Sequence, residues 1–256
     1  MPDYAFGDND LALQRLQVLA AAFAPSTRIF VRQAVPRPPA LAIDLGCGPG
    51  YTTHLLHATL NAKQSIGLDN LERFIAVAKR AETKQVTFQR HDVTQTPFPS
   101  GPAELLYCRF LLTHLKEPEQ ALTSWATQLR PGGVLVAEEV ERIETTDPVF
   151  TKYLPLVDAV LGDSHRLNIG AALEVMKPSG LRKRSSKVAR IPIATGMAAK
   201  MFHLNMQTWK ANPEQRQRYN AEQLEAIENG LLILTTKTGR ASEITWSLRQ
   251  LVWERT

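Results

Sequence analysis

The chain lacks the features that mark secreted, disulfide-bonded and membrane proteins. Only two of its 256 residues are cysteines, which is too few for a disulfide framework. The stretch nearest in character to a membrane segment, residues 16–24, is too short to span a bilayer. The residues that follow Met1 have neither the basic start nor the apolar core of a signal peptide. We therefore expect a cytoplasmic protein with reduced thiols and without a membrane partner.

The chain also has only a small excess of positive over negative charge, because its net charge is +5. The densest basic run is Arg182-Lys183-Arg184, and no aromatic residue lies between Tyr153 and Phe202. A nucleic-acid surface normally interleaves stacking aromatics with its cations. The run is therefore interpreted as a solvated strand or turn, and a nucleic-acid partner is disfavoured.

What the chain does contain is an apolar segment that leads into a glycine-rich turn at residues 41–50, Leu-Ala-Ile-Asp-Leu-Gly-Cys-Gly-Pro-Gly. Because glycine has no Cβ, Gly46, Gly48 and Gly50 let a ligand lie against bare backbone. Nucleotide phosphates favour amide N–H groups and positive charge at such a turn, and the Asp44 carboxylate would repel them. The segment therefore favours a cationic or amine-bearing ligand.

Strands and helices alternate regularly around this turn. Strands are expected at residues 40–45, 65–69, 85–90, 104–108 and 134–139, with helices at 51–60, 71–81 and 118–129. This alternation predicts a parallel sheet built from right-handed crossovers. Upstream, residues 8–24 and 27–34 are predicted to form two helices separated by Pro25 and Ser26.

The pattern changes after residue 139. Residues 147–180 and 197–236 are predicted to be mostly helical, a strand is expected at 187–193, and a last strand at 243–253. Helical segments of this kind inserted between late strands suit one domain with elaborations better than two domains.

Residues 41–50 resemble motif I of the class I S-adenosylmethionine (SAM)-dependent methyltransferases, which is an apolar strand, Asp or Glu, and Gly-x-Gly-x-Gly. The resemblance covers about residues 1–140 and is only architectural beyond them. It implies an α/β fold with a Rossmann-like, seven-stranded, mostly parallel sheet, helices on both faces, and N-terminal and inserted helices that form a lid. The single domain, 1–256, then divides into cover helices (1–35), a SAM-binding core (36–140), strand 6 with helical acceptor-site insertions (141–240) and a reversed final strand (241–256).

The resemblance also implies a cofactor, SAM, with S-adenosylhomocysteine (SAH) as its product, and a set of residues around it. Asp44 is placed near the methionine ammonium, Asp92 against the adenine amino group, and the backbone after strand 4 at the methionine end. Tyr4 and Arg15 are expected to close the site from the N-terminal helix. The cofactor-binding residues expected on this basis are Tyr4, Asp44, Gly46, Cys47, Gly48, Asp69, Asn70, Asp92, Val93 and Arg109.

Asp69 ends the second strand at about the 20-residue spacing at which an acid accepts both ribose hydroxyls. The spacing is shared by NAD-binding and SAM-binding folds, so it supports a ribose without choosing between them. Asp69 or Asn70 could instead cap the following helix. An NAD-type fingerprint needs Gly-x-Gly-x-x-Gly, whereas here the third glycine comes one residue early and Tyr51 follows it.

Several absences narrow the chemistry further. The segment after strand 4 has no Asn/Asp-Pro-Pro-Tyr/Phe motif, which disfavours methylation of exocyclic base amines. Some O-methyltransferases carry a Glu-x-x-Glu-His metal site here, where this chain has Phe110, Thr113 and His114. Because hard oxygen ligands are missing, we predict no catalytic metal. Cys108 is interpreted as a small buried residue rather than a nucleophile.

General-base candidates stand near the same strand ends. His114 and Glu139 are the predicted catalytic residues; Glu138, His165 and His203 are further candidates. Adjacent strand residues point to opposite faces, so one of the two glutamates is expected to face the pocket, unless both pair with surface bases. His203 lies in the apolar run 201–206, which either lines an acceptor pocket or packs in the core.

The function expected from these residues is SAM-dependent methyl transfer to a small organic acceptor, at a hydroxyl or carboxyl oxygen in preference to nitrogen. The transfer is expected to be an in-line displacement without metal. The alternatives are a methyltransferase for RNA or another macromolecule and a non-catalytic SAM-binding module. The partner is then a small-molecule acceptor, the protein a monomer or homodimer, and acceptor specificity lies in the insertions 141–180 and 195–240.

Overall fold

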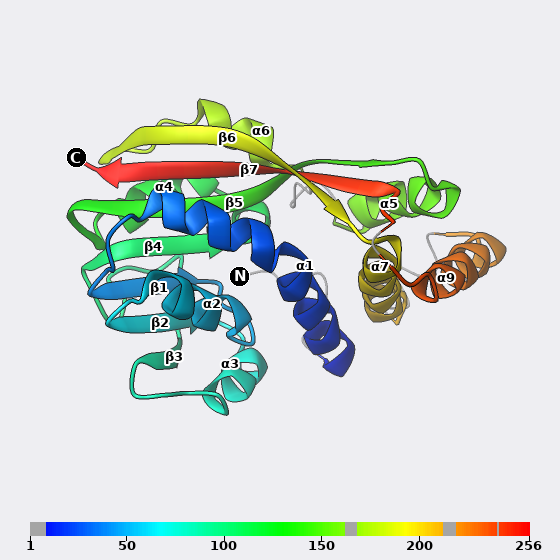
Figure 1. The fold of residues 1–256 in the computed structure, drawn as a ribbon, viewed down its shortest axis with the longest axis horizontal. Helices are drawn as coiled ribbons and strands as arrows, with labels where there is room; N and C mark the ends of the chain where they lie inside the picture. Colours follow the sequence, from blue (N-terminus) through cyan, green and yellow to red (C-terminus); the bar gives the residue numbers. More distant parts are fainter. Residues whose placement is uncertain (1–8, 162–167, 212–218, 240) are drawn as a thin grey trace.

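A seven-stranded sheet organises the molecule, with strand order β3-β2-β1-β4-β5-β7-β6 (Figure 1). The computed structural model describes residues 9–161, 168–211, 219–239 and 241–256. Neighbouring strands pair in parallel except at β7, which runs antiparallel to β5 and β6. The predicted seven-stranded, mostly parallel α/β fold is confirmed. The strands are β1 (Leu41–Leu45), β2 (Gln64–Asp69), β3 (Val86–Arg90), β4 (Ala103–Arg109), β5 (Leu129–Thr145), β6 (Leu181–Ile193) and β7 (Ile244–Arg255).

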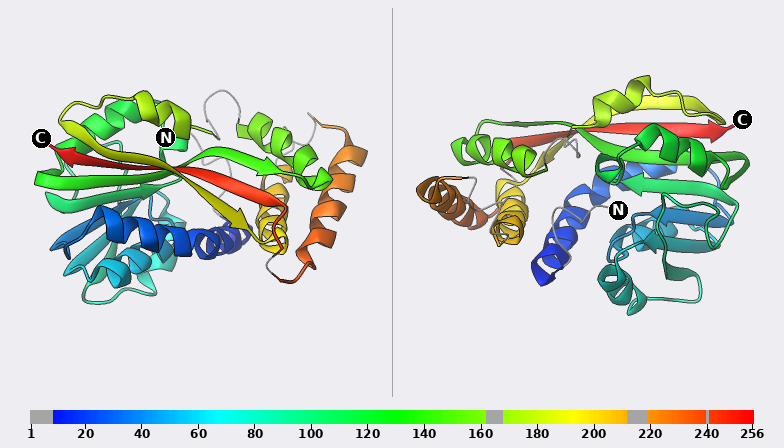
Figure 2. Two further views of the ribbon diagram at one scale, coloured as in Figure 1. Left: turned by 45° about the horizontal axis from the view of Figure 1, so that its top comes forward. Right: turned by 180° about the vertical axis from the view of Figure 1, so that it is seen from behind.

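Helices cover both faces of the sheet (Figure 2). On one face α1 and α2 pack through Phe30 and Leu56 against Leu105 of β4. On the other, α4 and α6 contribute Trp125 and Leu173 to a second core cluster. The helices are α1 (Asp10–Ala34), α2 (Tyr51–Leu60), α3 (Glu72–Lys79), α4 (Pro118–Ala126), α5 (Pro148–Leu161), α6 (Gly170–Val175), α7 (Thr195–Lys210) and α9 (Ala221–Thr235), with a 3-10 turn at Leu112–His114.

The pairing register brings the carboxyl ends of four strands level. Leu45 of β1 lies beside Leu68 and Cys108, and Arg109 of β4 lies beside Glu138 of β5. Segments that are distant in sequence therefore meet at one edge of the sheet: the glycine loop, the end of β2, the loop after β4 and the middle of β5.

The predicted alternation through β5 agrees with the structure, but the expected break at Pro25 was wrong. α1 is one helix with Pro25 inside it. An interior proline costs about 3 kcal/mol through its missing N–H and its ring. Phe23, Thr27 and Phe30, which flank it, are at most 2% exposed, and burial of this side of the helix offsets the loss.

The second half of β5 departs from the sequence expectation as well. The strand was expected to end at residue 139, but it continues to Thr145 and pairs with β7 from Val134 onward, with a shift of register between Val140 and Arg142. With β6 and β7 it forms a long extension past the carboxyl ends of the other strands (Figure 1). Three helices stand at the far end of this extension, α5, α7 and α9, which we call the cap. The N-terminal part of α1 lies between the sheet and the cap and packs on α7.

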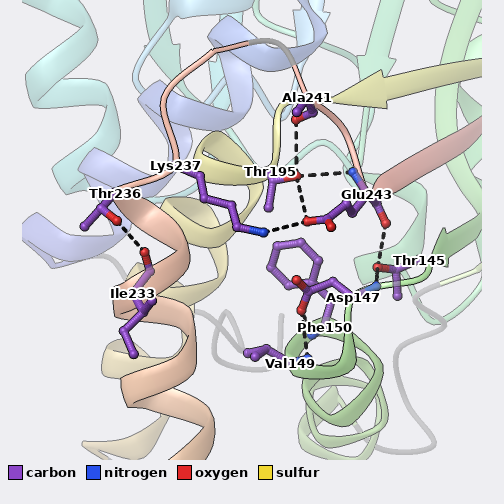
Figure 3. A network of polar contacts seen from close by, with 10 residues as sticks. All are labelled: Thr145, Asp147, Val149, Phe150, Thr195, Ile233, Thr236, Lys237, Ala241 and Glu243. Atoms are coloured by element: carbon purple, nitrogen blue, oxygen red, sulfur yellow. Dashed lines mark hydrogen bonds and ion pairs between the residues drawn. The ribbon is translucent and has the colours of Figure 1, made fainter.

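A polar network fastens the cap to the extension where the chain enters and leaves it (Figure 3). Glu243, just before β7, accepts from Lys237 Nζ at 2.9 Å, and its carbonyl accepts from the Thr145 hydroxyl at 2.8 Å. Asp147 Oδ1 accepts from the Val149 N–H at 2.8 Å and so caps α5. The ends of β5, α5, α9 and β7 are thereby held together, which fixes the cap over the strand ends.

Candidate active site

A cavity of about 410 Å³ lies between the strand ends and the cap. Its sheet end is formed by the loops that follow β1 to β4, and its cap end by β5, α5, α7 and β7. Of the residues predicted from the sequence, those that line the cavity are Arg15, Gly46, Gly48, Asp69, Asn70, Val93, Arg109, His114 and Glu139. The cavity therefore touches most of the strand ends that the sequence singled out.

The three glycines of the loop have different roles. All three have positive φ, 67° at Gly46, 53° at Gly48 and 88° at Gly50. A Cβ on Gly46 would lie 2.7 Å from Leu111 Cδ1, and one on Gly50 would lie 2.5 Å from Phe88 Cζ, so these two are needed for packing. A Cβ on Gly48 would meet only Leu16 Cδ1 at 3.7 Å. Gly48 is thus the position where bare backbone faces open space.

The N–H groups of the loop are already bonded within the protein. Gly46 and Cys47 donate to the Leu68 carbonyl at 2.8 and 3.0 Å, and Gly48 donates to Asp69 Oδ2 at 2.8 Å. A diphosphate bound here would have to compete for these donors and lie beside a carboxylate. An adenosine with a cationic side chain has no such conflict, so the loop chemistry fits SAM.

Asp69 links the loop to the second strand. Besides the Gly48 bond, its Oδ1 accepts from the Leu71 N–H at 2.9 Å. Burial raises the pKa of Asp69, while the bonds from Leu71, Gly48 and Asn70 oppose the shift. α3 begins at Glu72 after Leu71, without a side-chain cap, so the alternative in which Asp69 or Asn70 serves as the cap of this helix does not hold. Asp69 also lines the cavity, and a carboxylate has about four lone-pair sites, so it can accept from a ligand hydroxyl beside these bonds.

Asp44 lies beneath the loop rather than in the cavity wall. It is 2% exposed, its Oδ2 accepts from the Thr53 hydroxyl at 2.7 Å, and burial raises its pKa to about 7. Arg109, which sequence reasoning treated only as backbone, opposes that shift with its positive charge. Its guanidinium donates to Thr27 of α1 at 3.0 Å and Thr52 of α2 at 3.1 Å. The space beneath the loop therefore holds an acidic group, Asp44, and a basic group, Arg109, close together. The sequence had indicated only the acidic group there.

Three further residues singled out from the sequence are buried in the core or bonded to their own loop, and do not line the cavity. Cys47 is buried in a cluster with Phe88, and Cys108 is fully buried. Asp92 Oδ1 accepts from the Thr94 N–H and hydroxyl at 2.9 and 2.7 Å, and Asp92 is not among the lining residues. Tyr4 and His165 lie outside the described residues.

The adjacent glutamates at the end of β5 separate as strand geometry predicts. Glu138 accepts from the Tyr107 hydroxyl at 2.8 Å and from Gln250 Nε2 at 2.9 Å, inside the core. Glu139 faces the cavity, and its Oε1 accepts from the N–H groups of Leu111 and Leu112 at 2.8 and 2.7 Å. Within the described chain its buried Oε2 has no hydrogen-bond partner. Burial raises the pKa of Glu139 to about 8 against the effect of these N–H groups.

The histidine candidates divide between the two ends. His114, in the 3-10 turn after β4, lines the cavity. His203 lies in the cap, with its Nε2 4.0 Å from Glu228 Oε1, and is not a lining residue. Its neighbours Met201 and Phe202 do line the cavity. Some residues of the run 201–206 thus line the cavity and others do not. The spacing of residues in the sequence could not show which of them would do so.

Sequence reasoning missed other cap-end residues. Trp246 lines the cavity beside Ile143 and Leu154, and Asn205 does so from the run 201–206, which was a candidate lining only as a whole. No motif marks them, because each reaches the cavity through the packing of α5, α7 and the strand extension. The helical periodicity of α7 was the single available signal, and it indicates a buried face without saying what the face covers.

Basic side chains along β6 have acidic partners. Arg182, in the basic run, pairs with Glu254 at 2.9 Å, and Arg190, further along the strand, pairs with Glu144 at 3.1 Å. Across the described ranges, no helix is long and apolar enough to cross a membrane. Within the same ranges, no three His, Cys, Asp or Glu side chains are grouped to hold a metal ion.

Comparison with known proteins agrees with this geometry. Residues 43–137 match the family model of a methyltransferase domain. A trans-aconitate 2-methyltransferase of Yersinia pseudotuberculosis is 31% identical over 120 residues, 47% of this chain and 45% of that protein. The chain therefore spans less than half the length of this relative.

Two solved structures have the same fold at low sequence identity. Coclaurine N-methyltransferase, bound to N-methylheliamine and SAH, superposes with a TM-score of 0.58 at 12% identity, over 91% of this chain and 72% of that one. Phosphoethanolamine N-methyltransferase 2 of Haemonchus contortus, in complex with SAM, gives 0.55 at 13%, over 94% and 57%. Taken with the glycine loop and the sheet order, these comparisons show that residues 43–137 are similar to a methyltransferase domain and that the chain has the Rossmann-like fold of the class I SAM-dependent methyltransferases.

Proposed function

We propose that the chain is a SAM-dependent methyltransferase acting on an oxygen atom, hydroxyl or carboxyl, of a small organic molecule. The observation that carries the proposal is the single cavity that joins Gly48 and Asp69 at one end to apolar cap residues at the other. His114 and Glu139 line the same cavity. The trans-aconitate methyltransferase relatives support a small acceptor that reacts at oxygen.

In this proposal the sheet end holds the cofactor. Asp69 accepts hydrogen bonds from the ribose hydroxyls, and bare backbone at Gly48 lets the ligand approach closely. Val93 lies beside the adenine. The Arg109 guanidinium, held by Thr27 and Thr52, faces the methionine carboxylate, a charge for which a guanidinium fork is well suited.

When bound, SAM supplies a methyl group that is already activated by the adjacent sulfonium. What remains for the chain is alignment of the acceptor and exclusion of water. α1 and the cap enclose the cavity with apolar side chains. The Glu139 carboxylate holds the backbone of Leu111 and Leu112, which sets the loop that carries His114.

A hydroxyl acceptor must lose a proton, whereas a carboxylate need not. Because burial raises the pKa of Glu139 to about 8, its carboxyl favours the protonated form at neutral pH, and its buried Oε2 has no partner within the described chain. At neutral pH His114 is therefore the group that takes the proton, and Glu139 acts as a hydrogen-bond donor and positioning residue. This assigns different roles to two residues that the sequence presented as equivalent bases.

The test is methyl transfer from SAM labelled in its methyl group to a panel of hydroxyl, carboxyl and amine compounds. Label in a product that releases methanol in base identifies an ester, and a base-stable product of a hydroxy compound identifies an ether. Substitution of His114→Asn should slow transfer to hydroxyls and spare transfer to carboxylates. Transfer to amines alone, or to RNA, would contradict the proposal, and SAH binding without any transfer would indicate a non-catalytic module.

A further inference from the structure

The cap end of the cavity is apolar and lies outside the matched domain. Six of its side chains are Ile143, Leu154, Val157, Met201, Phe202 and Trp246. All of them follow residue 137, where the methyltransferase-domain match ends. The domain match therefore gives no information on what this end binds, and its own residues have to indicate the ligand.

Aromatic rings form a continuous wall across this end. Phe110, after β4, meets Phe23 of α1 edge to face at 5.1 Å between centroids, and Phe23 meets Trp246 at 5.9 Å. Trp246 packs on Phe202 at 5.5 Å, which packs on Tyr153 at 4.6 Å. Interlocked rings leave little freedom to repack. The wall favours a flat, ring-sized ligand over a flexible chain.

One polar side chain in this wall has an unused hydrogen-bonding atom. Asn205 is 6% exposed, lines the cavity, and donates from Nδ2 to the Tyr153 hydroxyl at 2.9 Å. Its buried Oδ1 bonds to no described residue. An unsatisfied buried carbonyl carries a desolvation cost that a ligand O–H or N–H would remove. The Tyr153 bond fixes the amide so that this oxygen stays available.

The charges at this end do not suit a polycarboxylate. Arg15 lines the cavity from α1 and could pair with one carboxylate, whereas the Asn205 carbonyl and the apolar side chains named above offer no partner to a second or third. Burying unpaired carboxylates against apolar side chains is costly. A ligand with three carboxylates, such as the one that names the Yersinia relative, is therefore a poor match for this end.

We propose that the cap end binds a largely apolar, ring-containing compound whose hydroxyl group donates a hydrogen bond to Asn205 Oδ1. The proposal rests on the proposed function in taking this compound as the methyl acceptor; the hydroxyl bonded to Asn205 anchors the ring, and the oxygen that is methylated is a different group of the compound. Asn205 then determines specificity: it selects ring compounds with a hydroxyl against the same rings bearing an ether or a carboxylate.

The test is a binding measurement on SAH-loaded protein. The probes are 2-naphthol, 2-methoxynaphthalene, 2-naphthoate and trans-aconitate, and their binding is measured by calorimetry. We expect 2-naphthol to bind about tenfold more tightly than its methyl ether, as one buried hydrogen bond would give, and more tightly than the naphthoate. Trans-aconitate should not displace it.

The Asn205→Leu variant sharpens the result. It should bring naphthol and its ether to within about twofold of each other and leave SAH affinity unchanged; the exposed Asn168→Leu is the matched control. Equal binding of naphthol and ether by the unaltered protein, no naphthol binding, or displacement by trans-aconitate would each overturn the proposal, whether or not the variant folds. Failure of the proposed function is seen separately, as absence of SAH binding or of methyl transfer.

Discussion

The two ends of the cavity are built by different means. At the sheet end, ligand-facing groups come from short loops fixed by local backbone bonds, such as those from Gly46 and Gly48 to the end of β2. At the cap end they come from helices and a strand extension that meet only in the folded chain, as Phe202 and Trp246 do. The site at the sheet end is determined by a few residues adjacent in sequence. The site at the cap end depends on packing between segments that are distant in sequence. Cofactor binding and acceptor choice should accordingly respond to different substitutions.

The largest expected effects come from paired substitutions of two buried phenylalanines. Phe150→Ala in the cap and Phe88→Ala beside the glycine loop should each lower the free energy of unfolding by about 3–5 kcal/mol. Phe88 fills the space beside Gly50, so its loss should also weaken SAH binding. Phe150 lies in the cap cluster, in edge contact with Phe202, and its loss should spare SAH.

Urea unfolding measures both stabilities, and calorimetry at a temperature where each variant is folded measures SAH binding. Hydrogen exchange on Phe150→Ala should show lost protection in α5, α7 and α9 and retained protection in β1 to β4. Equal loss of SAH affinity in the two variants would show that the two ends are not separable.

The next largest effect concerns Asp69. Asp69→Ala should cost about 2 kcal/mol of SAH affinity, roughly 30-fold, because charge-assisted bonds to the ribose are lost. Asp92→Ala, at the end of the next strand, should change it much less, because Asp92 bonds Thr94 and does not line the cavity. Titration calorimetry compares the two. A larger effect at Asp92 would place the ligand along a different path over the strand ends.

The free energy of unfolding should also depend on pH, through two buried carboxyl groups near the sheet end of the cavity. Burial raises the pKa of Glu139 from 4.5 to about 8 and that of Asp44 from 3.8 to about 7. The folded protein therefore keeps protons that the unfolded chain releases above about pH 4.5, so the free energy of unfolding should fall as the pH rises from 5 to 8. Each group contributes at most about 1.4 kcal/mol per pH unit.

Glu139→Gln keeps an oxygen for the Leu111 and Leu112 N–H groups and removes the titration. From pH 5 to pH 8, the free energy of unfolding of Glu139→Gln should rise steadily relative to that of the unaltered protein. For Asp44→Asn the same relative rise should end at about pH 7. Stability curves that stay parallel to that of the unaltered protein at all pH values would contradict the assignment.

The smallest effect is expected where α1 covers the loop. Leu16 Cδ1 lies over Gly48, so Leu16→Ala should weaken SAH binding by a few-fold through lost apolar contact. Leu13→Ala, about one turn earlier in the same helix and outside the cavity wall, is the matched control. Identical affinities for the two variants would argue that α1 does not close the sheet end.

The sheet end could be anticipated from the sequence because its signals are local. The Gly-x-Gly-x-Gly turn and the acid at the end of β2 each follow a strand that periodicity reveals, and parallel pairing brings them to one edge. What spacing could not show is where a side chain turns after its strand. Asp44 lies beneath the loop on Thr53, and Arg109 reaches back to α1 and α2.

The cap end could not be anticipated in the same way. Asn205 becomes a site residue only because α7 packs on α1 beneath the extension of β5 and β7. Pro25 misled for a related reason: a local helix breaker was overruled by burial of its neighbours. Tertiary packing decided both outcomes, and helical periodicity, which indicates a buried face, does not show what that face covers.

The loop after β1 and the end of β2 are expected to hold an adenosine with a cationic side chain and to exclude a diphosphate. The most direct measurement is calorimetric titration of the unaltered protein with SAH, SAM and NADH, followed by SAH titration in the presence of excess NADH. We predict one SAH or SAM bound per chain, no heat from NADH, and no competition. Binding of NADH that displaces SAH, or absence of binding by SAH and SAM, would contradict the account.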